Sequence, residues 1–354
     1  MTSAAVLFDA PVLSASTQAV AEEARRGLTA SPRTLLPWLF YDEAGSRLFE
    51  DITALPEYYL TRTERDLFTT HAADIFAALQ CPASRRDVDT QTRSIPIAPT
   101  SLALIELGAG TASKTGILLR ALTQLQPHVQ YQPIDISPSA LDAARVNIER
   151  AIPGVAVRPV VANYVTDGYR IDRPARARIL ALYIGSSIGN FSPEEAHAIL
   201  TRLRSQLQPG DALLLGADLA PSATKPISTL LAAYNDKAGV TAAFNRNILH
   251  RLNRDLGANF RPDRFHHRAL WNTAHSRIEM HLASAIPQVV DIPANSAGPA
   301  LTLRFRRGES IHTENSYKFT SASICAMLTR AGFSVSRTFT DTDNLFAVTL
   351  ATAI

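Results

Sequence analysis

Leu104-Ile105-Glu106-Leu107-Gly108-Ala109-Gly110-Thr111-Ala112-Ser113-Lys114 is the stretch that decides the fold, because an apolar strand runs into a glycine-hinged turn that opens a helix. Gly108 and Gly110 let the backbone turn sharply and approach a ligand, since glycine has no Cβ and adopts positive φ without strain. The dinucleotide-binding pattern G-x-G-x-x-G requires a third glycine, but Ser113 occupies that position. The turn therefore predicts a nucleotide-cofactor site and argues against an NAD(P)-dependent oxidoreductase.

An acidic residue at the end of the next predicted strand follows at the distance expected for a βαβ unit. The segment Tyr131-Gln132-Pro133-Ile134-Asp135 is typical of a strand that ends in an acid, and Asp135 is placed to hold ribose hydroxyls. Glu106, the two glycines and this strand-end acid together form the pattern E-L-G-x-G with a later Asp. That pattern is similar to the one in class I S-adenosylmethionine-dependent methyltransferases.

The alternation of apolar runs with amphipathic stretches predicts a parallel sheet covered by helices on both faces. We expect strands at 102–107, 129–136, 155–161, 178–184 and 211–217, and helices after Ser113, Ser137 and Ser192. Ser137-Pro138 and Ser192-Pro193-Glu194-Glu195 are helix-start signals, with a capping hydroxyl and a proline at the first helical position.

The alternation of predicted strands and helices stops after position 217 and resumes near the end of the chain. We expect a helical stretch at 224–256, alternating segments at 268–273, 277–283 and 301–306, then a helix at 320–331 and strands at 335–339 and 346–350. The predicted fold is therefore α/β: a Rossmann-like sheet with an inserted α+β substrate-binding domain. We assign 65–220 and 318–354 to the methyltransferase domain, and 1–64 and 221–317 to the substrate-binding domain.

Composition excludes several classes of protein. The chain of 354 residues is 46% hydrophobic, and its net charge of +3 comes from basic residues spread along the sequence, so nucleic-acid binding is not implied. Its two cysteines, Cys81 and Cys325, predict neither a disulfide framework nor a zinc site and fit a reducing cytoplasm. The longest apolar runs are far shorter than the roughly 20 residues that cross a bilayer. We expect a soluble cytoplasmic monomer without metal, and a polar surface loop at 82–100.

Three further motifs make the interpretation more specific. They are Phe40-Tyr41-Asp42-Glu43-Ala44-Gly45 with the following Pro56-Glu57-Tyr58-Tyr59, then Gly185-Ser186-Ser187-Ile188-Gly189-Asn190-Phe191, and finally Ile311-His312-Thr313-Glu314-Asn315-Ser316-Tyr317-Lys318. In this order, and with Tyr234-Asn235-Asp236 between the last two, they resemble the L-histidine Nα-methyltransferases. That family makes hercynine in the first step of ergothioneine biosynthesis, and the resemblance covers roughly residues 30 to 350.

The resemblance implies a binding site for the methyl donor S-adenosylmethionine. By motif, Gly108, Gly110, Lys114 and Asp135 would contact the donor, with Tyr58 near its methionine end. The family often has Ala-Asp-Tyr or Ala-Asp-Phe after the third strand, whereas this chain has Ala162-Asn163-Tyr164. An Asn163 oxygen still accepts a hydrogen bond from the adenine amino group, so we expect donor binding of altered strength at Asn163 and Tyr164.

The resemblance also implies a histidine-binding site, closed against the donor by the substrate domain. Asn190 and Tyr234 would bind the carboxylate and the α-amino group, and together with Tyr41 they would carry the catalytic roles. The imidazole would be bound by Tyr41 and Glu314. Ser316 would stabilise these two side chains, and Met280 would line the pocket. A buried carboxylate at Glu314 gives imidazole a charge-assisted hydrogen bond that apolar amino acids cannot return.

Other interpretations stay open at the level of the residues. The enzyme could methylate another amino acid or an aromatic amine, or it could be a binding protein that has lost turnover. Lys114 and Lys318 could be surface charges only. His266 and His267 lack further ligands at metal-binding spacing, so we interpret them as exposed loop residues.

Overall fold

The computed structural model describes residues 14–80, 101–166 and 168–354, and it divides into two compact units. Unit 1 consists of Met1–Tyr58 and Ser228–Ser316, and unit 2 consists of Tyr59–Ile227 and Tyr317–Ile354. The loop expected at 82–100 lies outside the described residues, as does Cys81. That one part of the chain binds the donor and the other the substrate stays a prediction.

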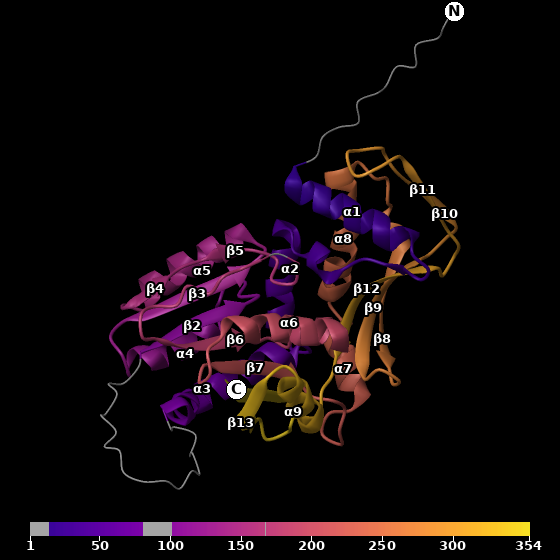
Figure 1. Ribbon diagram of the computed structural model, residues 1–354. Helices are drawn as coiled ribbons and strands as arrows, with labels where there is room; N and C mark the ends of the chain where they lie inside the picture. The colour runs from indigo at the N-terminus through magenta and orange to yellow at the C-terminus, as the bar shows by residue number, and fades with distance from the viewer. Residues whose placement is uncertain (1–13, 81–100, 167) are drawn as a thin grey trace, which may run out of the picture. The chain divides into compact units, whose positions relative to one another are not determined.

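Unit 2 is built on a sheet of eight strands (Figure 1). The strands are β2 (Leu102–Leu107), β3 (Val129–Asp135), β4 (Val155–Val157), β5 (Val160–Val161), β6 (Arg178–Tyr183), β7 (Ala212–Asp218), β13 (Phe333–Thr340) and β14 (Phe346–Ala353). Their order is β13-β14-β7-β6-β2-β3-β4, with β5 paired to β3. The central pairs are parallel, while β14 runs antiparallel to both β7 and β13. This Rossmann-like arrangement confirms the predicted fold class.

Five helices pack on this sheet: α3 (Tyr59–Gln80), α4 (Thr115–Thr123), α5 (Pro138–Ala151), α6 (Pro193–Gln206) and α9 (Ser321–Arg330). A single buried apolar cluster joins β2, β6, β7 and β14 to α6 and α9. The predicted helix starts are confirmed, since the Ser137 hydroxyl caps α5 and Ser192 forms a capping box with Glu195 at α6. The strand expected at 155–161 is instead two short strands, because Pro159 between them cannot donate to the sheet.

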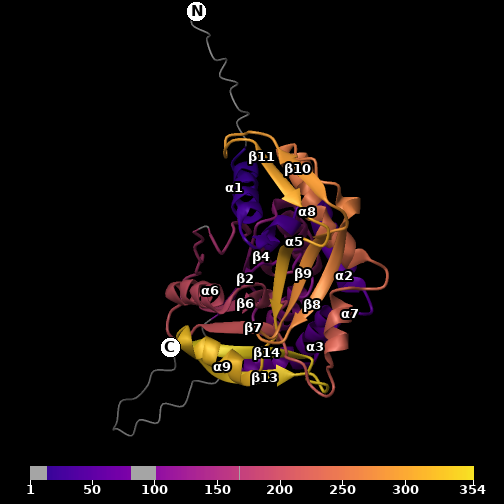
Figure 2. The ribbon, with the colours of Figure 1, turned by 90° about the vertical axis from the view of Figure 1, so that its right-hand side faces the viewer.

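Unit 1 combines helices with two small sheets (Figure 2). Its helical elements are α1 (Ala15–Thr29), η1 (Pro37–Phe40), α2 (Glu43–Ala54), α7 (Ile227–Ala233, which starts at the last residue of unit 2), α8 (Val240–Leu256) and η3 (Pro262–Arg264). One sheet has the order β1-β12-β9-β8, formed by β1 (Arg33–Thr34), β12 (Ser310–Tyr317), β9 (Arg277–Ser284) and β8 (Phe265–Asn272). The other pairs β10 (Gln288–Ile292) with β11 (Leu301–Phe305).

The helical stretch expected at 224–256 is broken into α7 and α8. Asp236 accepts hydrogen bonds from the backbone N–H groups of Val240 and Thr241, at 2.9 and 2.8 Å, and so caps the start of α8. Gly239 adopts a left-handed conformation with φ of 77°, which glycine tolerates and which a continuous helix cannot contain. This break leaves Tyr234 in the turn that follows α7 rather than on a helix.

Glu106 is a buried acid within β2, 2% exposed. Thr115 donates a hydrogen bond of 2.7 Å to its Oε2 atom, and the Tyr131 hydroxyl donates to the same oxygen. Burial raises the pKa of the Glu106 carboxyl to about 7, against the lowering effect of these two hydrogen bonds. The folded protein therefore holds this proton at pH values where the unfolded chain has released it.

We expect the free energy of unfolding to fall as pH rises from about 4.5 to about 7, because only the folded state is protonated there. Glu106→Gln keeps the size of the side chain but cannot ionise, so it should remove from this pH dependence a contribution on the order of 3 kcal/mol. Urea unfolding of both proteins at about pH 5 and about pH 8 measures the difference. An identical pH dependence in wild type and variant would contradict the assignment.

Candidate functional site

The glycine-hinged turn of unit 2 has the backbone that its sequence predicts. Gly108 and Gly110 have φ of 69° and 52°, in the left-handed region. The N–H of Gly108 donates to the carbonyl of Ile134 at 2.8 Å, which ties the turn to β3. A Cβ on Gly110 would meet nothing within 4 Å, so the space in front of this residue is open. Both the positive φ and this open space suit close approach of a ligand to the backbone.

Asp135 ends β3 beside this turn, as predicted. Its Oδ2 atom accepts from the N–H of Gly110 at 2.8 Å, and its Oδ1 atom accepts from the N–H of Ser137 at 2.9 Å. Burial raises the pKa of the Asp135 carboxyl, against the lowering effect of these amide hydrogen bonds. The acid therefore shapes the glycine turn directly, in addition to any contact it makes with a ligand.

Glu64 is the central residue of this site that sequence reasoning missed. It lies on α3, its side chain is fully buried, and its carboxylate forms an ion pair with Lys114 at the start of α4. The N–H of Gly185 donates to both carboxylate oxygens, at 2.8 and 3.0 Å. A Cβ on Gly216 of β7 would collide with this carboxylate, so that glycine makes room for it. Lys114 is thus held in a buried ion pair and is not a plain surface charge.

The loop after β6 carries Asn190. Gly185 and Ser186 both adopt left-handed φ, of 76° and 59°, before the short helix η2 (Ser187–Asn190). The Ser186 hydroxyl accepts from the N–H of Asp218 at 2.9 Å, which ties the loop to the end of β7. Asn190 is half-buried at the end of η2, in the same unit as the glycine turn.

Asn163 and Tyr164 also belong to unit 2. The Asn163 Oδ1 atom accepts from the N–H of Val165 at 3.1 Å, so this side chain caps a local turn. Tyr164 lies beside the glycine turn, since a Cβ on Gly108 would come 3.4 Å from its ring. Tyr164 therefore lies at the glycine turn, and donor binding by Asn163 and Tyr164 stays a prediction.

In unit 1 the structure brings three of the predicted residues into one aromatic cluster. Phe49 packs edge-on against Tyr41 and Tyr58, with ring centroids 5.7 and 6.4 Å apart, and Tyr58 packs against Tyr234 at 6.3 Å. Phe244 of α8 contacts both Tyr41 and Phe49. Phe49 and Phe244 were not among the predicted site residues.

Strand β12 brings the remaining predicted residues of unit 1 together. The hydroxyl groups of Tyr234 and Ser316 form a hydrogen bond of 2.6 Å. Thr313 donates to the carbonyl of Met280 on β9 at 3.0 Å, and the next residue, Glu314, is half-buried. Ser316 and Tyr234 are therefore in direct contact, and Met280 lies beside Thr313 of the strand that also carries Glu314.

The histidines of unit 1 differ from the sequence interpretation. His266 and His267 lie on β8, not in a loop, and His267 is part-buried, with its Nε2 atom 2.8 Å from the carbonyl of Tyr234. Alternation along the strand explains the error, because successive side chains point to opposite faces. His267 therefore helps to fix the backbone of the turn that carries Tyr234.

Among the described residues, Glu279, His281 and His312 form a group with ligand atoms within 4.8 Å of one another. The two imidazole rings are stacked, with an angle of 19° between their planes. Glu279 is also paired with Arg277 at 2.6 Å, which adds positive charge beside the group. That the protein works without a metal stays a prediction.

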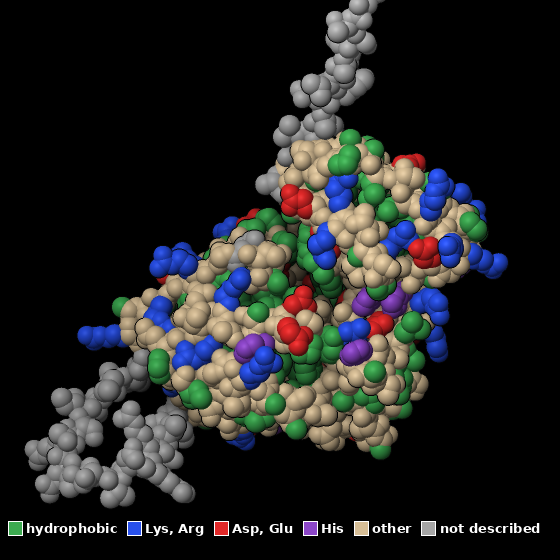
Figure 3. Space-filling view, turned by 45° about the vertical axis from the view of Figure 1, so that its right-hand side comes forward, with side chains coloured by type: hydrophobic (Ala, Val, Ile, Leu, Met, Phe, Trp, Pro, Cys, Tyr) green, Lys and Arg blue, Asp and Glu red, His purple; other side chains and the backbone are tan. Residues whose placement is uncertain are grey.

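On the face seen in Figure 3, Lys and Arg side chains are scattered among acidic and uncharged ones. In the part of the chain that the structure describes, no helix is both long enough and apolar enough to span a bilayer. That the chain binds no nucleic acid stays a prediction.

Comparison with known proteins adds independent findings. A family model described as a histidine-specific, S-adenosylmethionine-dependent methyltransferase matches residues 20–353. Histidine N-alpha-methyltransferase of Mycolicibacterium smegmatis is 39% identical over 94% of this chain and 95% of that protein, and the protein of the same name in Mycobacterium tuberculosis is 38% identical over 92% of each. Ergothioneine biosynthesis protein 1 of Neurospora crassa is 30% identical over 64% of this chain and 23% of that protein.

Replacing the buried acid Glu64 tests whether it organises a ligand site. We expect Glu64→Gln to weaken binding of S-adenosylmethionine by about tenfold, because Lys114 loses its buried counter-charge and the Gly185 loop loses a charge-assisted bond. Isothermal titration calorimetry measures the affinity, and Glu194→Gln, at an exposed position of α6, is the matched control. Equal affinities of both variants and wild type would contradict this role.

Proposed function

Because the chain belongs to the S-adenosylmethionine-dependent family of histidine-specific methyltransferases, we propose that it trimethylates the α-amino group of L-histidine to give hercynine. The match of residues 20–353 to that family is the observation that carries the proposal. The similarity to an ergothioneine biosynthesis protein supports a place at the first step of that pathway. S-adenosylmethionine is a co-substrate here. When bound, it supplies the methyl group that is attached to its sulfonium sulfur.

The reaction is an in-line displacement at carbon. The amine lone pair forms a nitrogen–carbon bond while the carbon–sulfur bond breaks and its electron pair stays on sulfur, so that S-adenosylhomocysteine is the other product. A proton must leave the nitrogen before each transfer, since only the neutral amine has a free lone pair. The protein contributes mainly alignment and exclusion of water.

Neutral hydrogen-bonding groups suit this chemistry at the amine. A free α-amino group is mostly protonated near neutral pH, and a negative charge beside it would stabilise that cation. In the proposal, Asn190 and Tyr234 bind the amino acid's carboxylate and amine, and both side chains are uncharged. The 2.6 Å bond between Tyr234 and Ser316 supports a fixed orientation for this phenol.

The product carries a permanent positive charge, and the aromatic residues of unit 1 suit it. A quaternary ammonium is attracted to aromatic faces by roughly 0.5 to 2 kcal/mol. Tyr41 and Tyr58 lie in the aromatic cluster with Phe49, which supports this role for them. Tyr59 follows Tyr58 in the sequence but contacts a different group. The Lys225 Nζ atom lies 4.9 Å from the centroid of its ring.

We place the reaction in the cytoplasm, carried out by a single chain without metal. Two cysteines in 354 residues, with Cys325 free, support a reducing compartment. Methyl transfer from a sulfonium needs no Lewis acid, because the leaving group is already activated by its charge.

A competition assay tests the proposed substrate. Purified protein is incubated with S-adenosylmethionine and an equimolar mixture of the standard amino acids, and the products are identified by mass spectrometry. We expect histidine heavier by three methyl groups. Methylation of another amino acid, or of an aromatic amine added in a parallel reaction, would overturn the substrate assignment, and S-adenosylmethionine binding without transfer to any amine would indicate a binding protein.

Glu314 is the residue proposed to select histidine. We expect Glu314→Gln to raise KM for histidine by about 10- to 100-fold, since one charge-assisted hydrogen bond to the imidazole is lost at a cost of roughly 1 to 3 kcal/mol. The affinity for S-adenosylmethionine should stay unchanged. Steady-state kinetics measure both, with Asp263→Asn, an exposed acid in the same unit, as control. An unchanged KM would remove Glu314 from the imidazole site.

A further inference from the structure

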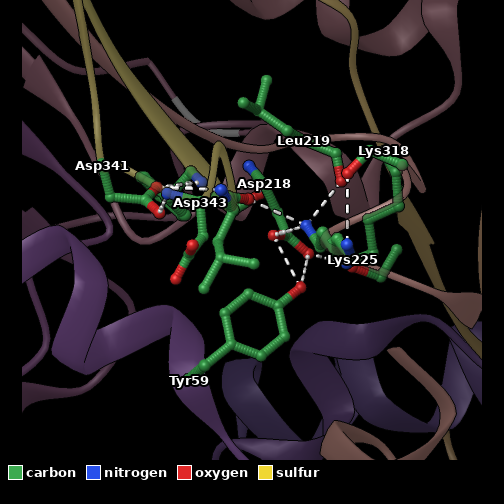
Figure 4. Close-up of polar contacts among 12 residues, drawn as sticks. Tyr59, Asp218, Leu219, Lys225, Lys318, Asp341 and Asp343 are labelled. Carbon is green, nitrogen blue, oxygen red and sulfur yellow. Dashed lines mark hydrogen bonds and ion pairs between the residues drawn. The ribbon is translucent and has the colours of Figure 1, made fainter. Parts of the chain in front are cut away.

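The carboxylate of Asp218 collects three side chains from distant parts of the sequence (Figure 4). The Tyr59 hydroxyl donates to both of its oxygens, at 2.8 and 3.0 Å. Lys225 Nζ lies 2.5 Å from Oδ1, and Lys318 Nζ lies 2.7 Å from Oδ2. The side chains of Asp218, Lys225 and Lys318 are all fully buried, so Lys318 is not the surface charge that the sequence allowed.

These three partners mark the places where the chain passes between its two units. The crossings are Tyr58 to Tyr59, Ile227 to Ser228, and Ser316 to Tyr317. Tyr59 is the first residue after the first crossing, Lys225 is the third residue before the second, and Lys318 is the second residue after the third. One carboxylate at the end of β7 therefore binds a residue close to each crossing of the chain.

The backbone around Asp218 reinforces these connections. The N–H of Phe319 donates to the carbonyl of Asp218 at 3.0 Å, which seats the third connection against β7. Lys225 also donates to the carbonyls of Leu219 and Leu345, at 2.5 and 2.8 Å. On its other side, the N–H of Asp218 binds the Ser186 hydroxyl of the loop that carries Asn190.

Stability alone does not explain this cluster. Two ammonium groups and one carboxylate are removed from water, and replacing a buried ion pair with apolar groups of similar size is often neutral or stabilising. What such a cluster does provide is a single geometry, because its donors are all satisfied only where their acceptors lie together in this arrangement. The residues next to its partners include Tyr58, beside Tyr59, and Ser316, two positions before Lys318.

We propose that Asp218 is a positioning residue for methyl transfer: by binding Tyr59, Lys225 and Lys318 it fixes the three connections between the units and, through them, the alignment of amine and methyl carbon. This inference rests on the proposed function, in which unit 2 binds the donor while Glu314, Ser316 and Tyr234 of unit 1 bind the amino acid. Alignment is then sensitive to the connections, since a misplacement of about 1 Å costs on the order of 100-fold in rate.

The test compares kcat with ligand affinity in matched pairs of variants. Tyr59→Phe removes only the hydroxyl bonded to Asp218, and its control is Tyr169→Phe, which removes a buried hydroxyl that has no hydrogen-bond partner. Asp218→Asn removes the shared charge, and its control is Asp211→Asn at the other end of β7, which breaks a buried ion pair with Arg173.

We expect Asp218→Asn to lower kcat by about 100-fold and Tyr59→Phe by about 5-fold. The dissociation constants of S-adenosylmethionine and histidine, measured separately by calorimetry, should each change by less than about threefold. Asp211→Asn should lower Tm as much as Asp218→Asn does while it retains kcat. Loss of kcat in proportion to Tm in both aspartate variants, or full kcat in folded Asp218→Asn and Tyr59→Phe, would overturn the proposal.

Hydrogen exchange provides a readout that does not depend on turnover. In Asp218→Asn, or in Tyr59→Phe for the first connection, backbone exchange should accelerate at 56–60, 224–228 and 315–319, whereas faster exchange confined to β7 would contradict the role. If wild type fails to methylate histidine, the proposed function fails, and this exchange pattern still decides whether Asp218 holds the connections.

Discussion

A buried carboxylate must be paired with donors, and the architecture of unit 2 depends on how this constraint is met. Glu64, Glu106, Asp211 and Asp218 are each at most 2% exposed. Each accepts from at least two groups, and in every case the donors come from different elements of the sheet, helices or loops. Because an unpaired buried charge costs several kcal/mol, the elements that supply these donors are fixed relative to one another within the unit.

The sequence predicts the framework of unit 2 well, because the signals involved are local. The strand at 102–107 and the helix starts at Ser137 and Ser192 depend on neighbouring residues and agree with the structure. Two errors have local causes, since Pro159 divides one expected strand and Gly239 ends one expected helix. Others occur where a distant partner decides the outcome. The two-residue strand β1 exists only because it pairs with β12, and His267 faces inward only because β8 belongs to a sheet.

The candidate site shows the same division. Gly108, Gly110 and Asp135 are found by motif, and the structure places them side by side. Glu64 and Asp218 escape detection because their partners are remote: Lys114 is 50 residues from Glu64, and Tyr59 is 159 residues from Asp218. No periodicity or spacing rule connects such pairs. The family resemblance indicates which residues would bind ligands, but the buried ion pairs beneath them emerge only from the fold.

The order of segments along the chain has a consequence for how the two units can be exchanged between relatives. Unit 1 is assembled from two stretches separated by most of unit 2, so the chain has three junctions between the units. A single genetic crossover between two relatives therefore cannot exchange one complete unit for another. A chimaera that replaces unit 1 needs both stretches from the same parent, together with junctions compatible with Tyr59, Lys225 and Lys318. Divergence of unit 1 is thus constrained to proceed by point substitution more readily than by recombination of whole units.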